Sequence, residues 1–368
     1  MPPSRASIVM SYQQVGEDEV DIGAAGSANG DITSDTAMVK VTVEKDTPEA
    51  LFTFFGVTMC LNKPGLGLPA AFWDRLMAVI FASLIISVVM VLTPTQMVEL
   101  WYMPVVGVGA ATLANAVPVG GGIVFFPFLV YFGVAGTFNA VAFGVSTQML
   151  GNGTFGFLNW LKKDPSRIVW RAMPYTVFPS FIGSTFAIFG PRVADEKAIK
   201  FMFGLFSLCV AGFVLYASAN GGVHEVVARH RGASAIGVDD TSSASIGHGS
   251  WLVVMVGSVV GGWIVGNIGI GNAIVTFVSL TVVLGVDSHQ AVPSSIIAGG
   301  WTSAYNGLIH LLWLHDVPIH LWLMVLPGVF CGAYVAPHVH TAMGTDRMLV
   351  IFGLFLTLSA LHMLYVSL

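Results

Sequence analysis

The chain has 368 residues, of which 55% are hydrophobic and only 10% are charged, and its mean hydropathy is +0.79. Soluble domains carry about 25% charged residues, so this composition excludes an ordinary soluble protein and predicts a polytopic membrane protein. The formal net charge is −5, but nine of the 20 acidic residues precede residue 50. The acidity is therefore mainly a property of the N-terminal tail, and no basic patch indicates a nucleic-acid partner.

Residues 1–68 are predicted to form a polar, largely disordered tail that ends in a short interfacial segment. The stretch "GAAGSANGDITSDT" (23–36) is poor in apolar side chains and is typical of disorder. The apolar piece "ALFTFFGVTMCL" (50–61) is too short to cross a bilayer, which takes about 20 residues. Residues 69–100 then hold an extra first transmembrane helix, centred on "LMAVIFASLIISVVMVL" (76–92).

A long apolar segment from 103 to 134 is interrupted by "PVGGGIVFFP" (118–127). Glycine loosens helices and proline removes a backbone donor. Irregular backbone is tolerated at membrane depth only where protein buries it or water reaches it. We therefore expect a re-entrant pair of half-helices that breaks near Asn115 to Gly122 beside a cavity. Three transmembrane helices follow near 138–161, 168–190 and 198–218.

After a polar loop at 219–250 the same order of elements returns. A second long segment at 251–286 should break near Gly266 to Asn272, and it is followed by spans near 288–314, 319–341 and 348–367. "GGGIV" (120–124) aligns with "GNAIV" (271–275), and "FGLFSLCVAGFVLY" (203–216) aligns with "FGLFLTLSALHMLY" (352–365). The fold class is thus an all-α polytopic membrane protein with two internal repeats, at 101–218 and 251–368, each a broken hairpin followed by three transmembrane helices.

Loop charges indicate that the repeats are inverted, because Lys and Arg prefer the cytoplasmic side. "KKDPSR" (162–167) is basic, whereas its counterpart "LHDVP" (314–318) holds no Lys or Arg. This arrangement places the N-terminal tail in the cytoplasm. Arg192 and Lys197 would then face outside, against the rule.

Each break starts a new half-helix whose first N–H groups lack partners and carry partial positive charge. Glycine lets a ligand approach that backbone, so the breaks predict an anion site without a buried Arg or Lys. Hydroxyl groups in the following spans could add donors, or they could bond their own helix backbone; the glycines could equally serve helix packing. The candidate substrate-binding residues are Gly120, Gly121, Gly122, Ser146, Thr147, Gly271, Asn272, Ser294 and Ser295.

Titratable groups inside the predicted spans are few. His310 is a candidate proton relay, with a hydrogen-bonded histidine near the interface as the alternative. Cys60, Cys209 and Cys331 lie far apart in apolar surroundings and predict small buried hydrophobes, not a metal or redox site. We expect no metal, no cofactor and no enzymatic activity, and the partners expected are a small anion and the lipid bilayer.

The glycine-rich motifs "PVGGGIVFFPFL" (118–129), "NIGIGNAIVTFV" (267–278) and "AVPSS" (291–295) resemble the TauE/SafE sulfite exporter family over residues 103–367. Repeat 1 departs from the family pattern at "AVAFGVST" (140–147), and repeat 2 lacks the third glycine and the proline. The resemblance implies a secondary transporter that exports a small anion such as sulfite or an organosulfonate. The plasma membrane is the default location if the source is a bacterium. An anion channel, or a non-transporting scaffold or receptor that works through its tail, remains an alternative.

Overall fold

The computed structural model describes residues 50–54, 57–60, 64–191, 195–220, 226 and 248–368. All of them belong to one compact unit that begins at Pro48. The polar tail predicted from the sequence falls on residues outside the described part, and so does most of the predicted loop at 219–250.

The described chain begins with two short strands, where the sequence predicted an interfacial apolar segment. β1 (Ala50–Phe54) and β2 (Val57–Cys60) pair antiparallel, with Phe54 opposite Val57. Phe, Thr and Val favour strands, and pairing satisfies the backbone groups of a segment that is too short to span a bilayer. Every other described element is a helix, so the all-α prediction is confirmed for the membrane part.

The extra first helix is present and is longer than predicted. After a short 3₁₀ turn, η1 (Pro64–Gly67), α1 covers Ala70–Val91, and α2 (Pro94–Glu99) follows with a Thr93–Gln96 capping box. α1 packs mainly on α13 through Trp73, Met77 and Val88. Leu76, Ile80, Phe81 and Leu84 are partly buried against the core. The opposite face, with Val79, Ile86, Val89 and Met90, is exposed, as expected where the solvent is lipid.

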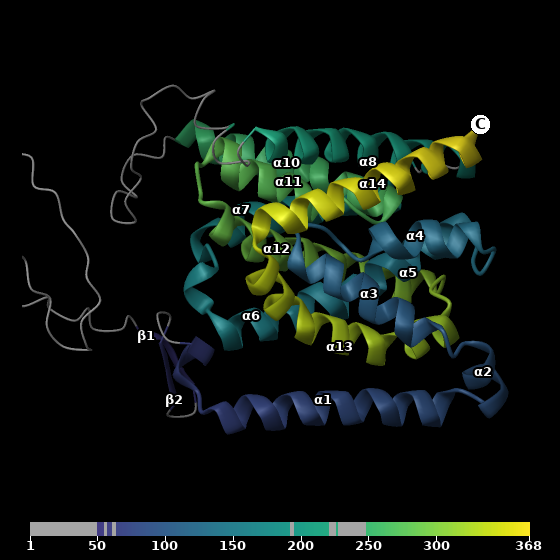
Figure 1. Ribbon diagram of the computed structural model, residues 1–368, viewed down its shortest axis with the longest axis horizontal. Coiled ribbons are helices and arrows are strands. Elements are labelled where there is room, and N and C mark those ends of the chain that lie inside the picture. The colour runs from purple at the N-terminus through teal and green to yellow at the C-terminus, as the bar shows by residue number, and fades with distance from the viewer. Residues whose placement is uncertain (1–49, 55–56, 61–63, 192–194, 221–225, 227–247) are drawn as a thin grey trace, which may run out of the picture. The chain divides into compact units, whose positions relative to one another are not determined.

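The remaining elements are described in two consecutive sets, one on each side of residues 221–247 (Figure 1). The first set is α3 (Met103–Ala116), α4 (Gly122–Tyr131), α5 (Thr137–Leu150), the π-helical η2 (Gly151–Gly156), α6 (Phe157–Lys163), the 3₁₀ turns η3 (Pro165–Arg167) and η4 (Trp170–Ala172), α7 (Met173–Phe189) and α8 (Glu196–Ala219). The second set is α10 (His248–Ile268), α11 (Asn272–Val278), the π-helical η6 (Ser279–Val283), α12 (Ser288–Ile309), the π-helical η7 (His310–Leu314), α13 (Ile319–Met343) and α14 (Thr345–Ser367).

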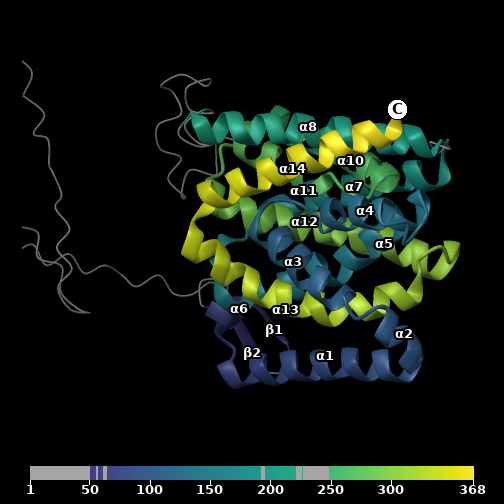
Figure 2. The same ribbon diagram turned by 45° about the vertical axis from the view of Figure 1, so that its right-hand side comes forward.

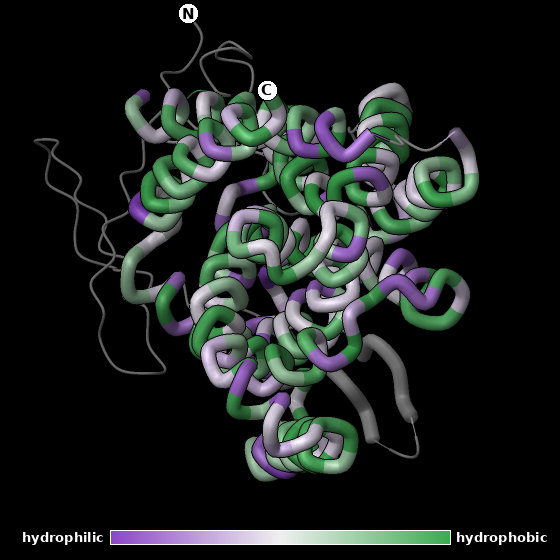
Figure 3. Tube along the Cα trace, turned by 90° about the vertical axis from the view of Figure 1, so that its right-hand side faces the viewer, coloured by the Kyte–Doolittle hydropathy of each residue, from purple (hydrophilic) through white to green (hydrophobic). Residues whose placement is uncertain are grey.

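Six of the described helices are long and apolar enough to cross a membrane, so the protein is an integral multi-pass membrane protein. Two further helical rods, α5–η2–α6 and α12–η7, run through the middle of the bundle (Figures 1 and 2). Viewed along the helices, hydrophobic segments make up much of the outer surface (Figure 3). Cys209 and Cys331 lie exposed on this outer surface, which corrects the prediction that they are buried.

Helices of the two sets pack in a reciprocal pattern. α3 packs along α13 and α7 packs along α10, while α8 lies on α14 and α5 on α12. If α5, η2 and α6 are counted as one continuous helix, the first helix of each set thus meets the fourth helix of the other. Small residues allow these contacts: a Cβ at Gly328 would lie 1.9 Å from the Pro104 carbonyl, and one at Gly183 would lie 1.9 Å from the Val259 carbonyl. Such close backbone approach is typical of membrane helices.

The two ends of the bundle can be told apart. β1, β2 and α6 lie at one end, which we name the strand end, and α2 lies at the other, the α2 end (Figures 1 and 2). α3 and α4 form a hairpin attached at the α2 end.

Candidate transport site

The first helix break is where the sequence predicts it. α3 ends at Ala116 and α4 begins at Gly122. Pro118 favours this break because the residue before a proline is pushed out of the helical region. Every residue from Ala114 to Ile123 is buried, so protein covers the irregular backbone.

Glycine is required at this break because neighbouring groups approach closely. A Cβ at Gly120 would lie 2.0 Å from the Oε1 of Gln148. A Cβ at Gly122 would lie 2.7 Å from the carbonyl oxygen of Gly269. Gly121 is less confined, since its nearest neighbour is the Phe125 ring at 3.2 Å.

The second break lies between Ile268 and Asn272. Gly269 and Gly271 have φ values of +76° and +135°, which residues with a side chain rarely adopt. Asn272 opens α11, and its Nδ2 donates to the Thr302 hydroxyl at 2.7 Å. The Oδ1 of Asn272 is buried and has no partner among the described residues.

Gln148 joins the two breaks at the centre of the bundle. Its Nε2 donates to the carbonyl of Gly269 at 2.8 Å, and its Oε1 accepts from the Ser303 hydroxyl at 3.1 Å. Because the same side chain fills the space beside Gly120, it touches both breaks and α12 together.

Two of the predicted hydroxyl ligands lie deep in the bundle. Ser146 and Thr147, on α5 beside Gln148, are 0% and 1% exposed. Neither hydroxyl has a hydrogen-bond partner among the described residues, and a buried hydroxyl without a partner is costly. Both are free to donate to a ligand.

The other two predicted hydroxyl ligands are engaged with backbone. Ser294 Oγ donates to the Gln290 carbonyl at 2.6 Å and accepts from the Val169 N–H at 2.8 Å. Ser295 Oγ donates to the Val292 carbonyl at 2.8 Å. Ser294 therefore fastens the linker before α7 to α12.

His310 lies at the α2 end and pairs with an acid. Its Nδ1 is 2.8 Å from Asp316 Oδ1, and its Nε2 is buried without a partner among the described residues. Both side chains line a cavity of about 90 Å³ together with Gly266 and Asn267. The cavity reaches Gly266 and Asn267, just before the second break, and none of the nine predicted substrate-binding residues lines it.

None of the buried polar side chains of the described residues is Asp, Glu, Lys or Arg. The breaks are therefore surrounded by neutral donors, amides and helix ends, which suits a small anion better than a cation that needs carboxylates.

The sequence model of the sulfite exporter TauE/SafE family matches residues 103–363. The chain belongs to this family. The match covers both helix breaks and starts at the first residue of α3, so α1 and everything before it lie outside it. TauE/SafE proteins are exporter-type membrane transporters, and this protein is one of them. The search of curated proteins and the search of solved structures each found no match.

Several polar residues at the centre of this TauE/SafE protein were not among the nine predicted site residues. They are Gln148, Thr302, Ser303, Asn152, Asn306 and Ser180. All six are polar residues in otherwise apolar helices, which was the available signal, and Gln148, Thr302 and Ser303 adjoin other polar residues. Their partners sit up to 155 positions away in the chain, and spacing alone does not reveal such pairs.

Proposed function

We propose that this protein is a secondary transporter that exports a small oxyanion of the sulfite or organosulfonate class. The anion binds between the two helix breaks, at the N-termini of α4 and α11. One observation carries the proposal: the breaks, 147 positions apart, are in contact, since Gly122 has no room for a Cβ against the Gly269 carbonyl.

The chemistry of this contact suits an anion. At the start of α4 the N–H groups of Ile123, Val124 and Phe125 donate to the carbonyls of Gly120 and Gly121. The N–H groups of Gly121 and Gly122 are the donors left for an anion, and the helix dipole adds partial positive charge there. Ser146 and Thr147 offer two buried hydroxyl donors. The walls of the anion site are formed by Gly120, Gly121, Gly122, Gly271 and Asn272. Ser294 and Ser295 are weaker candidates for anion contact, because their hydroxyls already bond backbone carbonyls.

Alternating access follows from two repeats, 101–218 and 251–368, that rock against each other. The reciprocal packing of α3 on α13 and α7 on α10 supports a pseudo-two-fold relation between them. Residues 69–100 add a helix outside the repeats, residues 219–250 join them, and residues 1–68 form a tail. In the described conformation both breaks are buried, which supports a carrier with an occluded state more than a channel.

The strand end faces the cytoplasm, and the N-terminal tail lies on the same side of the membrane. Lys162, Lys163, Arg167 and Arg171 lie in the connection between α6 and α7 at that end, and Lys197 and Lys200 at the start of α8 are opposed by Asp195 and Glu196. The membrane is the plasma membrane. A potential negative inside then drives anion exit with about 2.3 kcal/mol per charge per 100 mV, so no coupled ion is required. His310 with Asp316 is the candidate proton relay if one operates.

Counterflow in proteoliposomes tests the proposal. Vesicles loaded with unlabelled sulfite, sulfoacetate, taurine, sulfate or chloride receive labelled sulfite outside. We expect accumulation driven by sulfite or a sulfonate, and its loss in Gly122→Ala.

Gly109→Ala is the matched control, because a Cβ at Gly109 on α3 meets nothing within 4 Å. Flux with every anion including chloride would identify a channel. Folded protein that moves no anion would contradict the proposal.

A further inference from the structure

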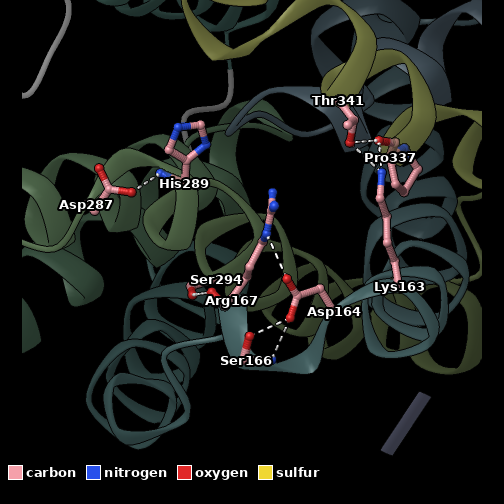
Figure 4. A network of polar contacts seen from close by, with 9 residues as sticks. All are labelled: Lys163, Asp164, Ser166, Arg167, Asp287, His289, Ser294, Pro337 and Thr341. Carbon is pink, nitrogen blue, oxygen red and sulfur yellow. Dashed lines mark hydrogen bonds and ion pairs between the residues drawn. The ribbon is translucent and has the colours of Figure 1, made fainter. Parts of the chain in front are cut away.

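A group of basic side chains lies at the strand end, and Figure 4 draws three of them, Lys163, Arg167 and His289. It consists of Lys163 at the end of α6, Arg167 in η3, His289 at the start of α12 and His340 near the end of α13. We name these four residues the basic cluster. The positive charges of the other three act on His340, so the four residues lie near one another although they come from four elements.

The basic cluster leads from solvent to the first break. His289 is exposed, Lys163 and Arg167 are half-buried, and His340 is 3% exposed. The Nδ1 of His340 bonds the carbonyl of Ala116 at 2.7 Å. Ala116 is the last residue of α3, so the innermost member of the cluster touches the start of the break.

The cluster is arranged to present donors to a ligand. Asp164 accepts from the Arg167 Nε at 3.0 Å, and the tip of the guanidinium points away from Asp164 into the space between His289 and Lys163 (Figure 4). Asp287 is occupied as the N-cap of α12. Partial burial and the nearby Arg167 lower the pKa of Lys163, which lies beyond the apolar part of its helix, and Asp164 opposes the shift. The cations therefore repel one another, and an anion between them relieves that repulsion.

A buried donor without a partner among the described residues lies beside His340. Trp160 is fully buried, its Nε1 has no partner among the described residues, and its ring lies 5.9 Å from the ring of His340. The indole N–H can only donate, so its natural partner is an acceptor such as an oxyanion.

Resting on the proposed function, we propose that Lys163, Arg167, His289 and His340 form a second, cytoplasmic binding site that captures the small oxyanion and loads the first break. The planar guanidinium of Arg167 gives two parallel donors to an oxyanion. Lys163 donates to the Pro337 carbonyl and the Thr341 hydroxyl (Figure 4), so it contributes its positive charge. His340 contacts Ala116 on the inner side of this site. The ligand is the free anion in water and not the phosphate of a lipid headgroup.

Transport from the cytoplasmic face tests the site. Uptake of labelled sulfite into inside-out vesicles of phosphatidylcholine is measured against concentration for Arg167→Gln and His289→Gln. We expect the half-saturating concentration of sulfite to rise about tenfold for Arg167→Gln, because this variant loses one charge-assisted hydrogen bond to the anion. The maximal rate should be retained.

Lys162→Gln is the matched control. This variant removes a positive charge from the same connection between α6 and α7. Because Lys162 pairs with Asp74 at 2.8 Å, its loss should leave the concentration dependence of sulfite uptake unchanged. Equal effects of Arg167→Gln and Lys162→Gln, or an effect that needs anionic lipid, would overturn the proposal.

A second measurement does not depend on transport. In a background with the three native cysteines changed to Ser, His289→Cys is modified with anionic and cationic methanethiosulfonate reagents. Relative to a free thiol in solution, the anionic reagent should be favoured about threefold or more, and Arg167→Gln should abolish the preference. No preference would refute the capture site even if sulfite is transported. A clear preference in a protein that moves no sulfite would refute only the substrate of the proposed function.

Discussion

Replacing Gln148 by Met should separate the two helix breaks while keeping the volume of the side chain. Met cannot donate to the Gly269 carbonyl or accept from Ser303, so two buried hydrogen bonds of 2.8 Å and 3.1 Å are lost. A buried polar group left without a partner costs about 1–3 kcal/mol. The Ser303 hydroxyl can turn back to its own helix backbone, so the loss is near the cost of one orphaned carbonyl, about 2 kcal/mol.

Gln148 makes these two hydrogen bonds in the conformation in which both breaks are buried. A loss of about 2 kcal/mol reduces the population of that conformation about 30-fold. We expect the initial rate of sulfite counterflow to fall by a comparable factor, and the apparent melting temperature of the purified protein to fall by several degrees.

Gln290→Met is the matched control for the same chemical change. The side chain of Gln290 is only partly buried at the start of α12 and makes no hydrogen bond to the described residues. Counterflow and thermal unfolding should be unchanged in this variant. If Gln148→Met were as stable and as active as the wild type, the hydrogen bonds of Gln148 would not stabilise the contact between the two breaks, and the reasoning would be refuted.

Three further predictions concern packing, the serines and the histidine. Gly183→Ala should destabilise the protein by about 1–3 kcal/mol, because the new Cβ would lie 1.9 Å from the Val259 carbonyl. Gly212→Ala is the control, because a Cβ there meets nothing within 4 Å. Equal thermal stability of the two variants would contradict this packing. Ser295→Ala should leave sulfite affinity unchanged because its hydroxyl bonds the Val292 carbonyl, and a loss of affinity in binding titrations would make Ser295 a ligand after all. Asp316→Asn should abolish any effect of an imposed pH gradient on uptake, because Asp316 pairs with His310 beside the cavity. Counterflow at equal pH should persist. An unchanged response to the gradient would exclude this pair from proton coupling.

Local signals in the sequence were sufficient to locate the helix breaks. Gly and Pro act within a few residues, so Pro118 and the Gly120–Gly122 triplet predicted the end of α3 and the start of α4. Apolar run length predicted the spanning helices, although α1 begins at Ala70, before the apolar run that starts at residue 76.

Features that depend on tertiary contacts were not predictable in this way. Nothing local to Gln148 indicates that its amide reaches Gly269, and nothing local to Ser294 indicates that it bonds Val169. The outward position of Cys209 and Cys331 likewise depends on which helix face meets lipid. The strand pairing of residues 50–60 was missed because an apolar piece of that length suits a strand or an interfacial helix equally well.

The most direct test of the central claim is to locate the bound anion. Selenite has the shape and charge of sulfite, and its selenium gives an anomalous diffraction signal. Crystals grown with selenite should show a peak within hydrogen-bond distance of the backbone N–H groups of Gly121 and Gly122, beside the hydroxyls of Ser146 and Thr147. Selenium found only at the basic cluster or at other sites, with the two breaks empty, would contradict the claim that the broken helix ends bind the transported anion.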